Sequence, residues 1–239
     1  MNIEELIAKY PKIRPELPDA YRKRYVSDYQ DNRSGKTASF AKTLESWMHR
    51  QVAKASQGST ILELGGGNLN HLQFESAYET YDVVEPFEEL WRDSPQLDLV
   101  GTMYTDIRSI EPAKLYSKIL SIAVLEHLVE LPFILARSGL LLAEGGTFCA
   151  GIPTEGALAW YCGWKFGTGI PYQLRTGLDY SVLMKHEHVN NATEITELVR
   201  YFFKDVELSR FPLPIFHGSF YTCLTARNPR LDLCRRHGL

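Results

Sequence analysis

Short apolar runs alternate with helical patterns through the middle of the chain. Five runs have the length and the β-branched content of buried strands, at residues 61–64, 81–85, 97–104, 118–124 and 146–153. Helical patterns lie between several of them, notably around 87–92 and 128–142. Strands that alternate with helices predict parallel βαβ units, with right-handed crossovers, in a doubly wound sheet.

The N-terminal part of the chain has a different pattern. Three prolines between residues 11 and 18 exclude a continuous helix there and predict an arm. Helical periodicity follows over 19–56, with a break around 32–35. We therefore predict an N-terminal arm and helical cap over residues 1–57.

Residues 154–190 interrupt the alternation before regular patterns return. This segment is rich in Gly, Trp and Tyr, and it predicts an insertion or lid within a domain that spans 58–239. A helix is predicted at 192–203. Two strands follow at 205–211 and 218–226, close enough in sequence to pair antiparallel.

Composition and charge limit the classes of function. The chain has 239 residues, 44% hydrophobic and 23% charged, which suits one α/β domain with additions. A net charge of −3 argues against general binding of nucleic acid or of anionic membranes. No apolar run reaches the ~18 residues of a membrane span and no signal segment opens the chain, so we expect a cytoplasmic protein. The four cysteines form no CxxC pair and are expected to be reduced thiols.

The strongest chemical signal is a glycine turn after the first predicted strand. Gly65, Gly66 and Gly67 form the turn, Glu63 precedes it and Asn68 follows it. Glycines let a backbone approach a ligand closely and adopt positive φ. Ligands of open α/β sheets bind beyond the carboxyl ends of the strands, where this turn lies. A purely structural turn is the alternative for the glycines taken alone.

A second acid favours a nucleoside cofactor. Glu85 ends the next predicted strand, 22 residues after Glu63, and Pro86 follows it. A carboxylate at this place can accept both hydroxyls of a ribose. A nicotinamide dinucleotide would satisfy that too, but its pyrophosphate needs a helix N-terminus and usually a G-x-G-x-x-G turn. Here Gly67 is followed by Asn-Leu-Asn, so the last glycine of that pattern is missing.

Residues 61–68 resemble motif I of class I S-adenosylmethionine-dependent methyltransferases. Further motifs of that family follow in its order: the acid of strand two at 81–86, the acid after strand three at 105–107, the strand-four motif at 121–128 and the leucine-rich helix before strand five at 140–148. The resemblance covers about residues 59–226. One departure is Leu69, which stands at the family's third glycine position, and His71 or Leu72 could touch the cofactor there.

The resemblance implies both a fold and a cofactor site. The fold is a three-layer α/β/α, Rossmann-like sandwich with a seven-stranded methyltransferase sheet whose last strand is antiparallel. The cofactor is S-adenosylmethionine. Its implied contacts lie in the glycine turn and at the ends of the next strands, at Glu63, Gly65, Gly66, Gly67, Asn68, Glu85, Pro86, Asp106, Ile107, Ser121, Ile122 and Ala123.

Two histidines are candidates for the base that a hydroxyl acceptor requires. His127 follows the fourth strand, and His188 lies in a Glu-His-Val-Asn stretch similar to one found in small-molecule and saccharide methyltransferases. Packing without a chemical role is the alternative for each ring. His186 and His188 resemble a metal pair, but Glu187 and Asp179 are only weak candidates for a third ligand, so no metal site is predicted.

Aromatic and basic residues predict the acceptor site. Tyr25 and Tyr29 share one helix face, Arg33 suits a carboxylate and Trp160 could stack on a sugar; together with His186 they are the predicted substrate contacts. Packing is the alternative for the aromatic rings.

The predicted function is methylation of a small-molecule acceptor, at an oxygen of a saccharide or related metabolite. The saccharide rests on similarity to enzymes of bacterial polysaccharide clusters. The alternatives are an NAD-dependent oxidoreductase and a non-catalytic binding module with the methyltransferase fold. A homodimer is left open.

Overall fold

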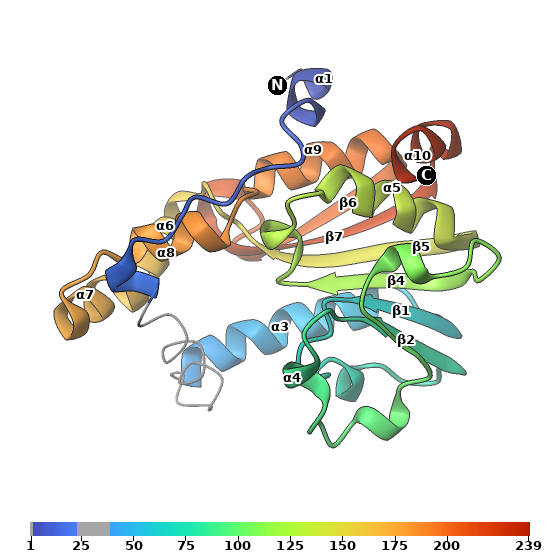
Figure 1. Cartoon of the computed structure of the whole chain (residues 1–239), viewed down its shortest axis with the longest axis horizontal. Helices are drawn as coiled ribbons and strands as arrows, with labels where there is room; N and C mark the ends of the chain where they lie inside the picture. The colour runs from blue at the N-terminus through green and yellow to red at the C-terminus, as the bar shows by residue number, and fades with distance from the viewer. Residues whose placement is uncertain (1, 23–38) are drawn as a thin grey trace.

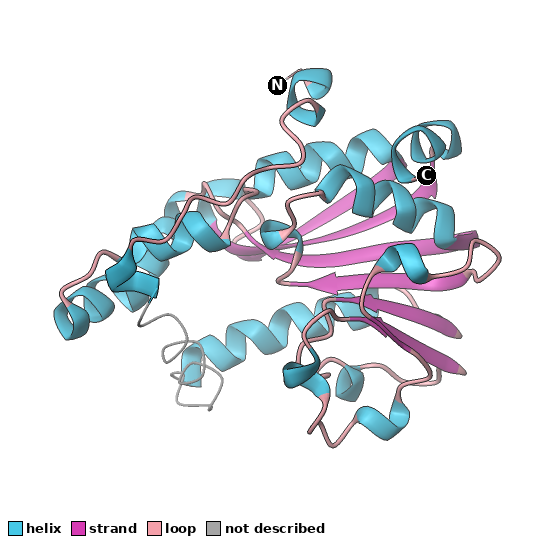
Figure 2. Ribbon diagram, in the orientation of Figure 1, coloured by secondary structure: helices cyan, strands magenta, loops and turns pink. Residues whose placement is uncertain are grey.

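The computed structural model of the chain describes residues 2–22 and 39–239, and a seven-stranded sheet runs through it between two layers of helices (Figure 1; Figure 2). The strands are β1 (Thr60–Leu64), β2 (Thr80–Val84), β3 (Met103–Tyr104), β4 (Tyr116–Ile122), β5 (Leu142–Pro153), β6 (Phe203–Pro212) and β7 (Ser219–Pro229). They lie in the order β3-β2-β1-β4-β5-β7-β6. The first five strands pair in parallel, whereas β7 runs antiparallel to both β5 and β6. The predicted fold, a Rossmann-like three-layer sandwich whose seven-stranded sheet has an antiparallel last strand, is confirmed.

The register of the parallel strands brings their carboxyl ends together. Leu64, at the end of β1, pairs with Val84 of β2 on one side and with Ser121 of β4 on the other. The strand order reverses between β1 and β4, which makes this edge a topological switch point. The crevice beyond it is where ligands of such sheets bind.

The two faces of the sheet are covered by different helices. α5 (Leu131–Leu141), α9 (Ala192–Phe202), α10 (Leu231–Gly238) and the short α1 (Ile3–Ile7) lie over one face, and α3 (Ser39–Ala55) lies along the other (Figure 1). Successive side chains of a strand point to opposite faces, so Leu62 joins the core under α5 and α9 while Ile61 joins the core under α3.

α3 packs directly on the sheet. Val52 of α3 shares a core cluster with Ile61 and Leu120, and a side chain at Gly151 of β5 would come within 3.2 Å of the Met48 Cβ. The division of the chain at residue 57 stays a prediction. Within that predicted cap, α3 belongs to one layer of the sandwich, whereas α1 contacts α9 in the opposite layer.

Residues 154–190 form a group of helices that extends from one end of the sheet, at the left of Figure 1. The group consists of α6 (Leu158–Trp164), the π-helical turn η5 (Lys165–Gly169), α7 (Ile170–Thr176) and α8 (Tyr180–Glu187). Tyr172 and Leu183 form a small core here with Leu17 and Tyr21 of the N-terminal arm. The Tyr21 hydroxyl donates to the carbonyl oxygen of Asp179 and accepts from the backbone N–H of Asp179.

The sequence patterns place most elements correctly, but the third strand is much shorter than predicted. Within residues 97–104 the chain forms a 3₁₀ turn, η2 (Leu97–Leu99), and only β3 at the end is strand. Gly101 packs against the second strand, since a Cβ at this position would lie 2.9 Å from the Asp82 Oδ1. α4 (Glu88–Trp91) is likewise a single turn. No helix in the described part of the chain is long and apolar enough to cross a membrane.

Candidate functional site

The glycine turn lies at the carboxyl end of β1 and has the backbone geometry that glycine permits. Gly65 has a φ of +73° and Gly67 a φ of +50°. A Cβ at Gly65 would lie 2.4 Å from the Val124 Cγ2, so the loop after β4 packs against the turn. The backbone N–H of Gly65 donates to the carbonyl oxygen of Val84, which fixes the start of the turn to β2. The turn therefore joins the ends of three neighbouring strands.

The Glu85 carboxylate holds the turn in place. One of its oxygens accepts from the backbone N–H of Gly67 at 2.9 Å, and the other accepts from the backbone N–H of Phe87 at 3.1 Å. The residue is 5% exposed. Each carboxylate oxygen has a second lone pair, so the group can still accept a hydrogen bond from a ligand hydroxyl. Pro86 and Asn68 are exposed.

Glu63 has a different environment. Its side chain lies below Gly66 on the α3 face, 2% exposed, and its Oε2 accepts a hydrogen bond of 2.8 Å from the Tyr81 hydroxyl. Burial raises the pKa of Glu63 to about 8, against the effect of the Tyr81 hydrogen bond. The carboxyl group thus supports the turn from beneath.

A buried polar network continues from this position beneath the turn. The Lys118 Nζ donates to the Glu75 carboxylate at 2.6 Å, and the same carboxylate oxygen lies 2.9 Å from the His71 Nε2. The His71 Nδ1 in turn lies 2.9 Å from the His49 Nδ1 of α3. Burial lowers the pKa of His71. His71, a candidate for a cofactor contact in the sequence, therefore faces α3.

The chain after the turn contains a 3₁₀ helix instead of an α-helix. η1 (Leu72–Phe74) is the first helical element after Gly67. Leu69, at the position where the family has glycine, has a φ of +66° and is fully buried. A left-handed conformation costs a branched residue about 1–2 kcal/mol, so burial of the Leu69 side chain must offset this strain.

Asp106 and Ile107 lie at the carboxyl end of β3. The Asp106 carboxylate accepts from the backbone N–H of Arg108 at 2.8 Å, which caps the turn η3 (Ile107–Ser109). It also pairs with the Arg108 guanidinium at 3.1 Å, and about half of its side chain stays exposed. Ile107 is buried in the core below. Asp106 can therefore meet a polar group of a ligand, whereas Ile107 supplies an apolar floor.

The end of β4 turns sharply beside the glycine turn. The Ser121 hydroxyl is buried and donates to the carbonyl oxygen of Leu64 at 3.3 Å, so β4 is tied to β1. Ala123 is exposed and has a φ of +53°, after Ile122 has ended the strand. This bend directs the next residues into η4 (Leu125–His127).

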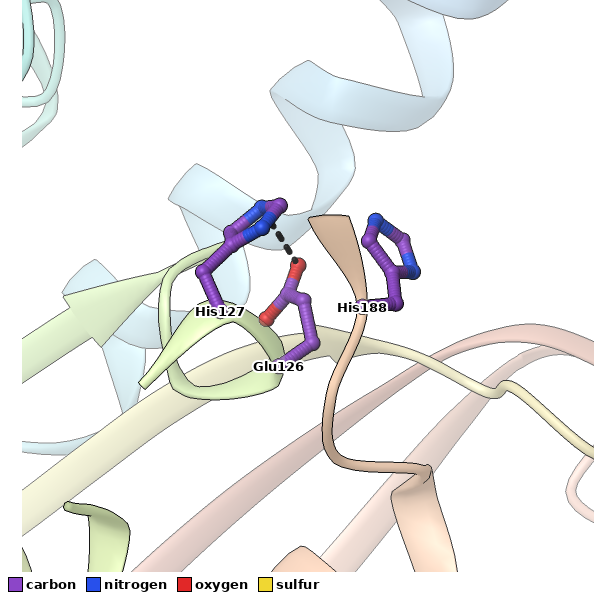
Figure 3. Close-up of side chains that lie close together, drawn as sticks. All are labelled: Glu126, His127 and His188. Atoms are coloured by element: carbon purple, nitrogen blue, oxygen red, sulfur yellow. Dashed lines mark ion pairs between the residues drawn. The ribbon is translucent and has the colours of Figure 1, made fainter. Parts of the chain in front are cut away.

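Glu126, His127 and His188 form what we call the Glu–His–His cluster. One ligand atom from each of the three side chains lies within 4.8 Å of the others. Figure 3 shows their side chains converging from η4 and from the turn after α8. The two imidazole rings meet edge to face, with 4.9 Å between their centroids. Glu126 is 2% exposed, whereas the His127 side chain is 31% exposed.

Hydrogen bonds fix the orientation of both imidazoles. The His127 Nδ1 lies 2.9 Å from the carbonyl oxygen of Glu187, and the His188 Nδ1 lies 2.9 Å from the Glu155 Oε2. A carbonyl oxygen only accepts, so the His127 Nδ1 carries a proton. Burial opposes protonation of His188, but the bond to Glu155 and the charge of Glu126 outweigh it, and the pKa of His188 is raised. Burial also raises the pKa of Glu126.

The N-terminal arm crosses the cluster and ties its two segments together. Arg14 donates to the carbonyl oxygen of His127 at 2.6 Å, and to those of His186 and Glu187 at 3.1 and 3.2 Å. The Lys12 Nζ donates to the carbonyl oxygen of Val189 at 2.7 Å. These bonds join residues more than a hundred positions apart in the sequence.

Asn190 completes this connection from the other segment. Its amide donates to the carbonyl oxygens of Leu125 and Leu128, both at 2.8 Å, and its Oδ1 accepts from the Tyr10 hydroxyl at 2.6 Å. The backbone N–H groups of Val189 and Asn190 donate to the carbonyl oxygen of Glu126. The geometry of the cluster therefore depends on the arm, on η4 and on the segment before α9.

Comparison with known proteins shows which fold this is. No protein-family model matches the chain, and no curated protein matches its sequence. Among solved structures, the plantazolicin methyltransferase BpumL, in complex with a monoazolic desmethylPZN analog and SAH, matches with a TM-score of 0.60 at 16% identity over 95% of this chain and 97% of that one. The chain has the methyltransferase fold. This agrees with the class I resemblance of its motifs.

Two further methyltransferase structures support the same assignment. The possible histamine N-methyltransferase from Thermotoga maritima matches with a TM-score of 0.58 at 14% identity over 87% of this chain and 97% of that one. The N-methyltransferase NodS from Bradyrhizobium japonicum WM9, in complex with S-adenosyl-L-homocysteine, matches with a TM-score of 0.52 at 14% identity over 96% and 98%. At these identities the likeness concerns the fold.

The methyltransferase fold brings many of the predicted site residues to one edge of the sheet. The glycine turn, Glu85, Asp106 and the end of β4 lie at the carboxyl ends of neighbouring strands. Trp160 lies near the cluster, with 6.4 Å between its ring and that of His188. His186 does not join the cluster, and its Nδ1 instead lies 2.7 Å from the carbonyl oxygen of Pro15.

The remaining predicted substrate contacts, Tyr25, Tyr29 and Arg33, lie outside the described residues. Two residues of the site were not predicted from the sequence. Glu126 stands in the strand-four motif but was not assigned a role, and Glu155 gave no local signal at all. A motif position in the sequence does not identify a partner that lies 33 residues away, as Glu155 does from His188.

Proposed function

We propose that this protein is an S-adenosylmethionine-dependent methyltransferase that methylates an oxygen of a small-molecule acceptor, a saccharide or a related metabolite. The observation that carries the proposal is the Glu85 carboxylate, buried at the switch point and bonded to the backbone of the glycine turn. A ribose placed there would meet a carboxylate that is already oriented. The glycine turn leaves room for the rest of the nucleoside, since nothing lies within 4 Å of a Cβ built at Gly67.

The cofactor site fits S-adenosylmethionine better than a dinucleotide. A pyrophosphate needs the N-terminus of an α-helix, and the chain after Gly67 forms turns and then the 3₁₀ helix η1. The antiparallel β7 between β5 and β6 also departs from the strand order of dinucleotide-binding sheets. The matched structures with bound SAH, the demethylated form of the cofactor, support the same choice.

The choice of an oxygen acceptor rests on the histidine pair. A hydroxyl must lose its proton before or during transfer, whereas an amine needs only to be neutral. His127 in η4, just after β4, and His188 in the turn after α8 supply two oriented imidazoles. Val124, between β4 and η4, packs against the glycine turn. We infer that the acceptor oxygen is activated at this pair. The matched structures include enzymes named as N-methyltransferases and one O-methyltransferase family protein from Burkholderia thailandensis. The fold alone therefore does not distinguish an oxygen acceptor from a nitrogen acceptor.

A hollow beside the cluster supports a saccharide-like acceptor. It has a volume of about 730 Å³ and lies between α6, the start of α9 and the turn η6 (Phe216–Gly218). Its lining combines aromatic rings with carboxylates, among them Trp160, Tyr161, Phe216, Glu155 and Glu194. Aromatic faces and carboxylate acceptors are the groups that bind the C–H faces and hydroxyls of sugars. Glu155 and Trp160 connect this hollow to His188.

Calorimetry and methyl transfer test the proposal in two steps. Titration with S-adenosylmethionine, SAH and NAD should show binding of the first two in the micromolar range and none of the third. Radiolabelled methyl transfer should then favour hydroxyl acceptors of sugars over matched amino sugars. NAD binding without SAH binding would overturn the cofactor, and transfer to the amino sugars alone would overturn the oxygen acceptor.

Variants of the pair test its role in the transfer. His188→Asn and His127→Asn should each lower turnover by about 10²–10⁴-fold, as expected for loss of acid–base assistance, with SAH affinity unchanged. His237→Asn, which alters a ring that packs on Tyr201 and Phe202 instead, is the control and should leave turnover within a few-fold. Turnover that is unchanged in both cluster variants would contradict the role of the pair.

A further inference from the structure

The Glu–His–His cluster has the donor set of a metal site. One carboxylate and two imidazoles converge from two segments, with their ligand atoms within 4.8 Å of one another. The His127 Nε2 lies 4.0 Å from the Glu126 Oε1. Ligands about 2.1 Å from a common ion lie about 3–4 Å apart, so side-chain movements of about an ångström would complete the coordination. Figure 3 shows that the three groups point toward one another.

The Glu126 carboxylate is buried and incompletely satisfied. Its Oε2 has no hydrogen-bond partner among the described residues, although the residue is 2% exposed. Buried polar atoms nearly always have a partner, and a buried carboxylate without one is costly unless it is paired or bound to a metal. The unpaired oxygen belongs to the one acid in the cluster. This observation points to a cation and is independent of the convergence of the ligand atoms.

The hydrogen bonds of the two imidazoles have the arrangement found around metal ions. Metal-ligating histidines usually donate their other ring N–H to a carboxylate or to a backbone carbonyl. The His188 Nδ1 faces the Glu155 carboxylate, and the His127 Nδ1 faces the carbonyl oxygen of Glu187. Both rings therefore keep the Nε2 as the nitrogen that can coordinate. Arg14 fixes the same Glu187 carbonyl, so the support extends to the N-terminal arm.

We propose that Glu126, His127 and His188 bind a divalent transition-metal ion, such as Zn²⁺ or Mn²⁺, at the acceptor side of the site. Two imidazoles and one carboxylate suit first-row transition ions, whereas Mg²⁺ and Ca²⁺ prefer all-oxygen sites. Three protein ligands leave at least one coordination position open. That open position is available to an oxygen of the acceptor.

The role of the ion rests on the proposed methyl transfer. The acceptor hydroxyl coordinates to the ion, which lowers its pKa, and its proton passes to solvent water. The oxygen then attacks the methyl carbon of the sulfonium: a C–O bond forms, the C–S bond breaks, and the electron pair of the C–S bond remains on sulfur to give S-adenosylhomocysteine. With the ion bound, the two histidines are ligands, so they activate the acceptor through the metal rather than as free bases.

Metal binding can be measured without any activity assay. The full chain, freed of any affinity tag and treated with a chelator, is titrated with Zn²⁺ and with Mn²⁺ in a calorimeter. Co²⁺, added separately, reports on nitrogen coordination by its visible absorption. We expect one ion per chain with at least micromolar affinity, and a Co²⁺ spectrum typical of mixed nitrogen and oxygen ligands.

Variants decide whether the ion lies in the cluster. Glu126→Gln and His188→Asn should each weaken binding at least 10-fold, whereas the matched control His186→Asn, two residues from His188, should leave it within 2-fold. Glu155→Gln should weaken binding about 10-fold because it alters only the group that orients His188. Wild-type binding no tighter than that of the triple variant Glu126→Gln, His127→Asn, His188→Asn would overturn the proposal. A loss of metal affinity in His186→Asn equal to that in the cluster variants would also overturn the proposal.

The design separates failure of the metal site from failure of the proposed function. SAH affinity is measured in the metal-free and metal-loaded protein. SAH binding with no metal site would overturn only the present inference, and a metal site without SAH binding would overturn only the proposed methyltransferase activity. Thermal unfolding of each variant shows whether it is folded, and the Co²⁺ spectrum of the wild-type chain tests the site even if a variant does not fold.

Discussion

The two halves of the candidate site are built in different ways. The proposed cofactor half consists of the glycine turn and Glu85, and its main contact joins residues 18 positions apart in the sequence. The proposed acceptor half is the Glu–His–His cluster, where His127 meets Glu187 across 60 positions and Arg14 reaches His127 across 113. One half follows from neighbouring strands of the sheet, whereas the other exists only when three distant segments have docked.

This difference in construction determines how sensitive the geometry of each half is to substitutions elsewhere in the chain. A turn held by backbone N–H groups and one carboxylate keeps its geometry with few constraints on other side chains. A cluster assembled by an arm and two loops can be altered by changes in any of the three. We therefore expect the cofactor half to be insensitive to changes in the arm. Turnover, in contrast, should depend on the arm.

The largest expected effect is the loss of SAH affinity when the Glu85 carboxylate is removed. Glu85→Ala removes the acceptor for the backbone N–H groups of Gly67 and Phe87 and the proposed acceptor for the ribose. SAH affinity should fall at least 100-fold, which corresponds to about 2.7 kcal/mol. Calorimetry with SAH measures this, and Glu89→Ala, an exposed acid of α4, is the control. If Glu85→Ala bound SAH within 3-fold of the wild-type chain, this half would not be the cofactor site.

A smaller effect should separate the two halves from each other. Arg14→Ala removes the donor to the carbonyl oxygens of His127, His186 and Glu187. We expect turnover to fall about 10-fold and the free energy of unfolding to fall by about 2 kcal/mol, because three bonds to a charged donor are lost. SAH affinity should stay within 2-fold of the wild-type value.

Two variants sharpen this test. Arg14→Lys keeps the charge but cannot reach several carbonyls in a planar fork, so it should restore only part of the turnover. Lys9→Ala, on an exposed position of the same arm, should change neither quantity. A parallel loss of SAH affinity and turnover in Arg14→Ala would show that the halves are not independent.

The same contrast explains what the sequence could predict. The sheet, the glycine turn and Glu85 follow from apolar periodicity and from residues close together along the chain, and the structure confirms the predicted fold. The cluster could be predicted only in part. His127 and His188 were candidates by residue type, but Glu126 was not paired with His188, because periodicity does not say which loops meet.

Two other features depend on tertiary packing in the same way. The sequence made His71 a candidate for a cofactor contact, but the ring turns toward His49, a contact that exists only because α3 packs on this face of the sheet. Residues 97–104 are predicted to be a strand, but Leu97–Leu99 form the 3₁₀ turn η2, and only Met103 and Tyr104 pair with β2 in the ladder. Neither this turn nor the contact of His71 with His49 has a local signature in the sequence.

The last expected effect concerns stability rather than binding or turnover, and it depends on Glu63, the acid beneath the glycine turn. Glu63 lies one residue before the end of β1, and Glu85 directly follows the end of β2. Both are buried, yet Glu85 accepts from backbone N–H groups and Glu63 accepts from the Tyr81 hydroxyl. Burial raises the pKa of Glu63 from 4.5 to about 8. Its protonated form is therefore favoured in the folded state, and the unfolded chain releases the proton first as pH rises. The free energy of unfolding should accordingly fall as pH rises from about 5 to 8.

Glu63→Gln should remove this dependence while keeping an acceptor for the Tyr81 hydroxyl. Urea unfolding at pH 5, 6.5 and 8 measures it, and the wild-type chain should lose on the order of 2–4 kcal/mol more than the variant over that range. Glu79→Gln, an exposed acid next to β2, should keep the wild-type dependence. If Glu63→Gln and the wild-type chain changed in parallel with pH, Glu63 would be ionised beneath the turn. The cofactor half would then carry two negative charges, where the structure favours one.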